Sequence, residues 1–330
     1  MKRTIILTES DVKRLISIKE AMRIVEEAFR LCGLKRVQMP AKIYLHLPKY
    51  NGDFRAMPAY LEEPFESCGL KWVNVHPNNR RFGLPAVMAV FILNDPKSGF
   101  PLSIMDATYL TDIRTGAAGG VAAKTLARRD SHTVALVGCG AQAQTQLEAL
   151  NVNFDIRLVR MFDISTAAAQ KFLRKMSYLG LNMERAATIE GCVKDADIIV
   201  TTTPSRRPLV KQDWVGEGAH INAIGADAKG KQELDPELLK RAKIVVDDWH
   251  QASSAGEINV PIAKGLLSED DVYSTLGDIV AGKKRGRTSE EEITVFDSTG
   301  LAIQDVSVAS FIYKKALKKG IGKRIELVGQ

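Results

Sequence analysis

Cysteine is scarce in this chain, with four residues in 330 and no C-x-x-C pair. This spacing excludes a disulfide framework of the secreted kind and favours reduced, structural thiols. The five histidines are dispersed with no two at ligand spacing, so we expect no metal site and assign no role to His76 or His220. No apolar run approaches the roughly 20 residues that span a membrane. The apolar stretch at the start is too short for a signal peptide, and we therefore expect a cytoplasmic protein.

Aromatic residues make up only 6% of the chain, and acidic residues are fewer than basic ones, which leaves a net charge of +7. A nucleic-acid-binding surface would need basic clusters beside aromatic side chains. The basic clusters here are short, at Lys283–Arg285 and Lys314–Lys319, and are typical of solvated surface. We therefore expect neither a nucleic-acid nor a membrane partner. With 45% hydrophobic residues, the chain is long enough for two domains with their own cores.

The most informative segment lies at residues 133–144, where an apolar strand runs into Gly138-x-Gly140-x-x-Ala143 and then into a helical stretch. Gly138 permits a tight turn, Gly140 lets the backbone approach a pyrophosphate, and the helix N-terminus offers free N–H groups. Asp163 ends the next apolar run, 25 residues after Gly138. A carboxylate there binds the adenosine ribose 2′-OH and favours NAD over NADP, although it could instead cap the following helix. Together these residues predict a dinucleotide site.

Near-continuous apolar runs alternate with helical segments from about residue 115 to 300, which is typical of parallel strands buried on both faces. The strand candidates are 133–138, 157–163, 197–203, 219–224, 243–247 and 293–297. Helices between such strands give βαβ units. The pattern therefore predicts an α/β fold of the Rossmann type with a doubly wound parallel sheet.

The first 110 residues predict a different architecture. Capping-box patterns at Thr8 and Ser17 precede helices, and short alternating segments follow, with a hairpin signal at Asn51-Gly52. The expected strands are 43–47, 54–60, 69–75, 87–94 and 101–106. They predict a second, mostly antiparallel α+β domain.

Two further helices are expected at the borders of the parallel region. The run Arg114–Lys124 is so rich in small residues that it indicates the start of a tightly packed helix, with Arg114 at its beginning. The last helix, at about 301–318, has no strand after it, and we expect it to pack on the first domain.

Polar residues follow two of the buried strands at their carboxyl ends, where doubly wound folds bind ligands. The loop Thr201–Ser205 is either a cofactor contact or a plain polar loop closed by its proline. The segment Gly225–Asp227 ends the next strand, and Lys231 follows. Asp227 could contact a substrate nitrogen or orient a proton donor, but an aspartate after Gly-Ala is equally a turn residue.

Three basic residues lie on or beside neighbouring segments of the first domain, at Lys42, Arg55 and Lys71. In the strand that contains Lys71, the pattern by itself favours an outward, solubilising lysine, with an inward functional lysine as the alternative. Lys42 and Arg55 carry the same ambiguity. Together with Arg114, inward-facing side chains of this kind would form a carboxylate-binding pocket.

Taken together, the motifs resemble the ornithine cyclodeaminase/μ-crystallin family, and within it the archaeal-type alanine dehydrogenases. The resemblance covers essentially the whole chain. It rests on GLKWVNVHP at 69–77, DAT at 106–108, RTGAA at 114–118, GCGAQA at 138–143, TTTPS at 201–205, INAIGAD at 221–227 and DSTGLAIQD at 297–305. It implies a homodimer in which residues 1–115 together with 300–330 form a substrate-binding and dimerisation domain. Residues 116–299 would form an NAD-binding Rossmann domain.

By the same resemblance, Lys71 matches the family's catalytic lysine and Asp227 its catalytic acid, while Arg114 lies where substrate carboxylate and cofactor meet. Lys42 stands where the cyclodeaminases carry a substrate-binding arginine. At position 55 the cyclodeaminases carry a glutamate, whereas this chain has Arg55, as the alanine dehydrogenases do. An arginine there would repel a second ammonium group on the substrate. The implied cofactor-binding residues are Arg114, Thr115, Gly138, Gly140, Ala141, Gln142, Asp163, Ile164, Ser165, Thr202, Thr203, Gly225, Ala226, Asp227, Lys231 and Ser298.

These observations predict an NAD-dependent amino-acid dehydrogenase that converts L-alanine and water to pyruvate and ammonia, reversibly, by hydride transfer from Cα. Lys42, Arg55 or Arg114 would hold the substrate carboxylate, while Lys71 and Asp227 would manage the protons. The alternatives are an ornithine cyclodeaminase, an imine or ketimine reductase, and a non-catalytic μ-crystallin-like protein that binds NAD(P)H or another ligand.

Overall fold

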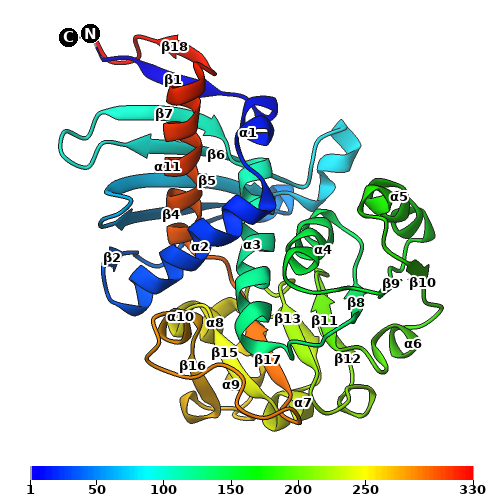
Figure 1. Cartoon of the computed structure of the whole chain (residues 1–330). Helices are drawn as coiled ribbons and strands as arrows, with labels where there is room; N and C mark the ends of the chain where they lie inside the picture. The colour runs from blue at the N-terminus through cyan, green and yellow to red at the C-terminus, as the bar shows by residue number, and fades with distance from the viewer. Residues whose placement is uncertain (1, 330) are drawn as a thin grey trace. The chain divides into compact units, whose positions relative to one another are not determined.

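The computed structural model describes residues 2–329, apart from the side chain of Arg80. The chain divides into two compact units, Met1–Arg114 with Leu301–Gln330 and Thr115–Gly300. Each unit combines helices with strands (Figure 1). No helix within residues 2–329 is long and apolar enough to cross a membrane.

The first unit is built on one sheet with the strand order β18-β1-β7-β6-β5-β4-β2, in which β3 also pairs with β4. Its strands are β1 (Thr4–Leu7), β2 (Val37–Gln38), β3 (Ile43–Leu47), β4 (Gly52–Leu61), β5 (Ser67–Val75), β6 (Val87–Asn94), β7 (Pro101–Asp106) and β18 (Lys323–Ile325). All strand pairs are antiparallel except β1 with β7. The predicted, mostly antiparallel α+β architecture is confirmed. The strands β1, β2 and β18 are not among the predicted ones, because all three are short segments without alternation.

Three helices of the first unit lie near this sheet: α1 (Glu9–Leu15), α2 (Ile18–Gly33) and α11 (Ala302–Lys319). Capping boxes at Thr8 and Ser17 open α1 and α2, as the sequence predicts. The helix α11 packs on β4, β5 and β6, and α2 packs on α11 (Figure 1). The expectation that the last helix packs on the first part of the chain is therefore confirmed.

The second unit contains an eight-stranded sheet in which every pair is parallel, with the order β10-β9-β8-β11-β13-β17-β15-β16. Its strands are β8 (Thr133–Val137), β9 (Leu158–Phe162), β10 (Met183–Arg185), β11 (Ile198–Thr201), β13 (His220–Ala223), β15 (Lys243–Val246), β16 (Val272–Thr275) and β17 (Thr294–Asp297). A separate pair joins β12 (Arg206–Val210) to β14 (Gln232–Leu234). The Rossmann-type fold is confirmed, and all six predicted strands are present.

Helices accompany these strands along the chain. They are α4 (Ala141–Asn153), α5 (Thr166–Met176), α6 (Ile189–Val193), α7 (Pro236–Arg241), α8 (Trp249–Ala255), α9 (Asn259–Ala263) and α10 (Leu276–Val280). Along β8, Val134 and Leu136 belong to one apolar cluster and Ala135 and Val137 to another. Because successive side chains of a strand point to opposite faces, the sheet is buried on both faces, which explains the near-continuous apolar runs.

The helix α3 (Thr108–Leu126) begins more than a turn before Arg114, so the expectation of a helix start at Arg114 is wrong. The carboxylate of Asp106 accepts hydrogen bonds from the backbone N–H groups of Thr108 (3.2 Å) and Tyr109 (3.1 Å). These two bonds satisfy donors that every helix leaves free at its N-terminus. The helix therefore starts where Asp106 supplies this support.

The small residues of α3 do allow the tight packing that the sequence predicts. A Cβ atom on Gly116 would lie 2.5 Å from the backbone carbonyl carbon of Thr145 in α4, and one on Gly119 would lie 1.9 Å from Gln146 Oε1. Gln146 Nε2 also donates a hydrogen bond to the Thr115 carbonyl at 2.9 Å. The two helices thus approach each other through their backbones.

Replacing Gly116 with valine should destabilise the fold by about 1–3 kcal/mol or more, because the backbone of Thr145 cannot move aside as a flexible side chain can. Gly216 is the matched control, since nothing lies within 4 Å of a Cβ atom built there. Thermal unfolding followed by circular dichroism should show a lower Tm for Gly116→Val and a nearly unchanged Tm for Gly216→Val. Equal Tm values would contradict the close approach of the two helices.

Candidate functional site

The glycine-rich loop follows β8 in the second unit. Gly138 has a φ of +99°, a backbone conformation that favours glycine. A Cβ atom there would also lie 2.9 Å from Thr202 Oγ1, so there is no room for a side chain. Gly140 is the N-cap of α4, with no side-chain capping bond and open space where its Cβ atom would be. Free helix N–H groups beside a side-chain-free backbone are what a pyrophosphate needs. The residues present therefore fit a dinucleotide.

Asp163 follows β9 and is held against this loop. Its Oδ2 accepts a hydrogen bond from the Cys139 backbone N–H (3.0 Å), and its Oδ1 accepts one from the Ser165 N–H (2.8 Å). The N-cap of α5 is Ser165, so the alternative in which Asp163 caps that helix is wrong. Ile164 is almost fully exposed beside it. The contact of Asp163 with a ribose stays a prediction.

The loops after the neighbouring strands meet at the same edge of the sheet. Thr202 Oγ1 donates a hydrogen bond to the Gly138 carbonyl at 3.3 Å, and the Ser298 N–H donates one to the Ala223 carbonyl at 3.0 Å. The structure thus brings together the predicted residues that follow β8, β11, β13 and β17. Thr115 lies apart from these loops in the chain, within α3.

Asp227 and Lys231 form an ion pair after β13, with Lys231 Nζ 2.5 Å from Asp227 Oδ1. Lys231 Nζ also lies 3.5 Å from the Gly225 carbonyl oxygen. The two residues that the sequence places in this loop are therefore neighbours, and the lysine holds the carboxylate of Asp227 close to the strand end.

Lys71 lies in β5 of the first unit with none of its surface exposed, whereas the adjacent Trp72 is 40% exposed. The outward orientation that the sequence pattern favours for Lys71 is wrong. Its Nζ donates a hydrogen bond to Asp305 Oδ1 at 2.8 Å. Arg114 Nε lies 3.0 Å from the same oxygen. One buried carboxylate therefore holds two cations.

Asp305 was missed in the sequence analysis. It lies in α11 with 0% of its surface exposed, and its neighbour Gln304 accepts a hydrogen bond from Arg114 Nη1 at 2.7 Å. The available signal was an acidic residue within an apolar helix, since a buried carboxylate requires a partner. That partner, Lys71, is distant in the sequence, which is why the pattern alone does not reveal it.

The surroundings of Lys71 in this cluster lower the pKa of its amine. Burial, together with the positive charges of Arg114 and Lys42, lowers the pKa of Lys71 from 10.5 to about 7, although Asp305 opposes the shift. The pKa in the folded chain lies below that in the unfolded chain. This group therefore makes the free energy of unfolding rise as the pH increases from about 7 to 10.5. Near neutral pH the amine can both hold and release a proton.

Arg55 is also buried, at 6% exposure. Its Nε donates a hydrogen bond to Asp53 Oδ1 at 2.8 Å, and its guanidinium lies 5.2 Å from the centroid of the Tyr44 ring. Met57 pairs directly with Lys71 across β4 and β5. Because residues two apart in a strand share a face, Arg55 faces the same side of the sheet as Lys71.

The two histidines of the sequence analysis have structural partners. His220 is fully buried, its ring nitrogens pair with Thr294 Oγ1 and Asn222 Oδ1, and burial lowers its pKa to about 3. His76 pairs with Asn74 Nδ2 at 3.0 Å. His220 is therefore neutral at physiological pH.

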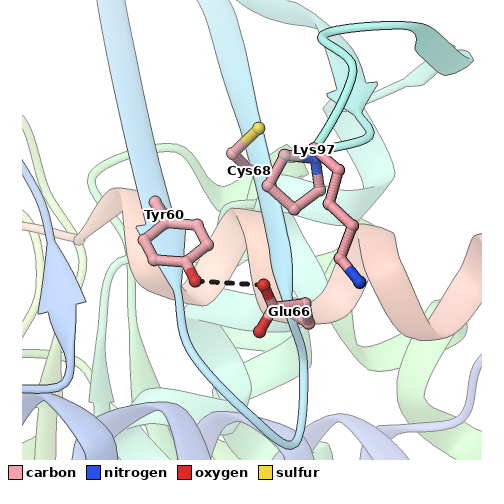
Figure 2. A pocket seen from close by; sticks show the side chains of 5 residues that line it. Tyr60, Glu66, Cys68 and Lys97 are labelled. Atoms are coloured by element: carbon pink, nitrogen blue, oxygen red, sulfur yellow. Dashed lines mark hydrogen bonds between the residues drawn. The ribbon is translucent and has the colours of Figure 1, made fainter.

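A pocket of about 380 Å³ lies on the first unit and is lined by Tyr60, Glu66, Cys68, Pro96 and Lys97 (Figure 2). Tyr60 donates a hydrogen bond to Glu66 Oε1 at 3.3 Å. None of the residues predicted for substrate or cofactor lines it, so the candidate site does not include this pocket.

The Lys71 amine should titrate near pH 7, and Asp305→Asn should lower its pKa further because the attraction of the carboxylate for the ammonium is lost. NMR of lysine side chains labelled with ¹³C at Cε, recorded across pH, measures both values. Lys71→Met removes the signal and so assigns it. A Lys71 signal that titrates near 10.5, or that Asp305→Asn leaves unmoved, would contradict the coupling.

Comparisons with known proteins agree with this arrangement. A profile of the ornithine cyclodeaminase/mu-crystallin family matches residues 2–320. The alanine dehydrogenase of Archaeoglobus fulgidus is 55% identical over 325 residues, which cover 98% of this chain and 98% of that protein. The resemblance inferred from the sequence motifs is therefore confirmed.

Two solved structures are similar over nearly their whole length. An archaeal alanine dehydrogenase dimer with bound NAD has a TM-score of 0.95 at 55% identity, covering 99% of this chain and 100% of that one. The Δ1-pyrroline-2-carboxylate reductase of Thermococcus litoralis, in complex with NADH and L-proline, has a TM-score of 0.95 at 38% identity, covering 98% of this chain and 100% of that one. On these grounds, the chain belongs to the ornithine cyclodeaminase/mu-crystallin family.

Proposed function

We propose that this protein is an NAD-dependent amino-acid dehydrogenase that interconverts L-alanine and pyruvate plus ammonia. The observation that carries the proposal is the buried cluster of Lys71, Arg114 and Asp305, in a chain 55% identical to an archaeal alanine dehydrogenase. Arg55, on the same face of the sheet and paired with Asp53, adds a guanidinium group. A positive charge there favours a substrate with a carboxylate and disfavours one with a second ammonium group.

The second unit would bind the cofactor. Bound NAD supplies the acceptor for the hydride that leaves the substrate Cα. The open N-terminus of α4 at Gly140 would hold the pyrophosphate, and Asp163 would bind the adenosine ribose, which favours NAD over NADP. Thr202, Thr203 and the Gly225–Asp227 segment would contact the remainder of the cofactor.

The first unit would bind the substrate and manage its protons. Lys42, Arg55 or Arg114 would hold the carboxylate of the amino acid. The Lys71 amine, with a pKa of about 7, would take a proton from the attacking water or return one to the leaving ammonia, together with Asp227. Such positioned acid–base groups typically contribute about 10²–10⁴-fold in rate. The net reaction consumes alanine, NAD and water, and yields pyruvate, ammonium, NADH and one proton.

The same residues support a second candidate, an imine reductase for cyclic imino acids. The observation in its favour is the likeness to the Thermococcus litoralis reductase, whose structure holds NADH and L-proline. A carboxylate-binding arginine and a proton-donating lysine would suit reduction of a cyclic C=N bond equally well. Net oxidation of alanine is the difference between the two candidates.

We further propose that the protein is a homodimer, as is the archaeal alanine dehydrogenase with bound NAD. Residues 1–115 with 300–330 would form the substrate-binding and dimerisation domain, and residues 116–299 the NAD-binding domain. The cytoplasmic location inferred from the sequence stays a prediction.

The reaction itself is tested by following NADH absorbance. Pyruvate with ammonia should consume NADH, and alanine with NAD should produce it, while ornithine should give neither net change nor proline. Δ1-Pyrroline-2-carboxylate serves as the competing substrate. If the imine is reduced and pyruvate with ammonia is not, the second candidate replaces the first. If NADH binds but nothing turns over, both are wrong and a binding protein remains.

Lys71→Ala should abolish turnover, with a loss of at least about 10²-fold in kcat, because it removes the amine whose pKa of about 7 suits proton exchange. NADH affinity should stay close to that of the wild type, since Lys71 lies in the other unit from the glycine-rich loop. Stopped-flow turnover and NADH fluorescence titration measure the two effects. Full activity in Lys71→Ala would rule out its assigned role.

Arg55→Met should raise the KM for pyruvate by about 10–100-fold, as expected for loss of a charge-assisted hydrogen bond to a carboxylate. Methionine keeps much of the side-chain volume in this buried position. Steady-state kinetics at saturating NADH give the KM, and Lys97→Met, an exposed lysine of the same unit, is the control. An unchanged KM in Arg55→Met would mean that Lys42 or Arg114 holds the carboxylate alone.

A further inference from the structure

Two carboxylic acids, Glu233 and Glu257, are fully buried together in the second unit, and the proposed mechanism uses neither. Glu233 lies in β14, and Glu257 lies between α8 and α9. Both oxygens of Glu257 accept hydrogen bonds from the Glu233 backbone N–H, at 2.9 and 3.1 Å. Oε1 of Glu257 also accepts one from the Leu234 N–H at 2.6 Å. Glu257 therefore holds the strand that carries Glu233.

The side chain of Glu233 joins two loops of the dinucleotide edge. Its Oε2 accepts hydrogen bonds from Thr201 Oγ1 (2.8 Å) and from the Gly225 backbone N–H (2.9 Å). Its Oε1 accepts one from the Thr203 backbone N–H (2.6 Å). One donor follows β13 and the others lie at the end of β11. Such short hydrogen bonds are typical of a charged acceptor.

The packing around Gly225 shows how closely these loops approach. A Cβ atom on Gly225 would lie 2.2 Å from the Thr203 carbonyl oxygen and 2.5 Å from Glu233 Oε2. Backbone and carboxylate therefore occupy the space that any other residue would need. The position of each loop is fixed by the other through Glu233.

The hydrogen bonds also decide which acid carries a proton. A neutral carboxyl group must donate through one oxygen, but backbone N–H groups converge on both oxygens of Glu233. A backbone N–H also reaches each oxygen of Glu257, but Oε2 accepts only a shared bond of 3.1 Å, whose donor lies closer to Oε1. Burial raises the pKa of both acids, and it raises that of Glu257 well above its usual range, with the charges of Glu233 and Asp297 raising it further. Two adjacent buried carboxylates would be costly, so a single proton stays on Glu257.

We propose that Glu233, as a carboxylate beside a protonated Glu257, is a positioning residue that sets the two loops contacting the nicotinamide half of the cofactor. The strand order supports the choice of this half. The adenosine ribose is assigned to Asp163 after β9, and β11 and β13 lie on the other side of β8. The inference rests on the proposed binding of NAD.

The test uses the full-length chain and the amide variants of the two acids. Glu233→Gln places an NH₂ group against backbone donors, and it should raise the Kd for NADH by about tenfold. AMP, which lacks the nicotinamide half, should bind within about twofold of the wild type. Glu257→Gln tests the proton assignment, because an amide resembles a protonated acid, and it should weaken NADH binding less than Glu233→Gln does. Glu237→Gln, at an exposed position of α7, is the control and should leave both affinities unchanged. NADH fluorescence and calorimetry with AMP measure these values.

The outcomes separate the inference from the proposed function. If the wild type fails to bind NADH, the proposed cofactor is wrong. If the wild type binds NADH and Glu233→Gln binds it equally well, or Glu257→Gln is the more damaging variant, the proton assignment is wrong. If Glu233→Gln weakens the binding of AMP as much as that of NADH, Glu233 supports the fold as a whole and does not position the loops at the nicotinamide half of the cofactor.

Thr201→Val provides a second test of the inference if the Glu233→Gln variant does not fold. It removes one donor from the Glu233 carboxylate while keeping the side-chain shape. It should raise the Kd for NADH by about threefold or more without changing that for AMP. Equal NADH affinity of Thr201→Val and the wild type, at unchanged Tm, would overturn the inference.

Discussion

The ion pairs of Asp305 are the constraint on which the chemistry of the first unit depends. A lysine and an arginine are both buried there, and each would be costly without an opposite charge. Asp305 supplies that charge from α11, a helix whose other buried residues are uncharged. The packing of α11 on β4, β5 and β6 is therefore also what places the carboxylate against Lys71.

In the second unit, buried or partly buried carboxylates also hold neighbouring segments together. There they accept hydrogen bonds from backbone N–H groups instead of pairing with cations. Asp163 ties the glycine-rich loop to the start of α5, and Glu233 ties the loops after β11 and β13. Asp247 accepts hydrogen bonds from the Thr299 and Gly300 N–H groups, both at 2.7 Å. Loops at the ends of parallel strands leave such donors unpaired. The acids satisfy them and hold the edge where a dinucleotide would bind.

The sequence predicts local features better than contacts between side chains that are far apart in the chain. The six parallel strands, the capping boxes and the glycine-rich loop follow from short patterns, and the structure contains them. The position of Lys71 between Leu70 and Trp72 favours an outward lysine, and the structure reverses this because Asp305 provides a buried partner that the strand pattern does not show. Asp305 and Glu233 were not predicted because their partners lie far away or on the backbone, and single-sequence patterns do not report such pairs. The residue roles came from the family resemblance, and they stay predictions.

The charges of the buried cluster favour a substrate that carries a carboxylate over an uncharged molecule. Arg114 and Asp305 carry opposite charges, so Asp305 offsets the charge of one of the two cations that it contacts. With its pKa near 7, Lys71 changes the net charge of the three residues between zero and plus one. The charged state attracts a carboxylate, and the neutral state provides an amine that can accept a proton. Binding and proton transfer are thus coupled through one carboxylate, at the pH where both states are populated.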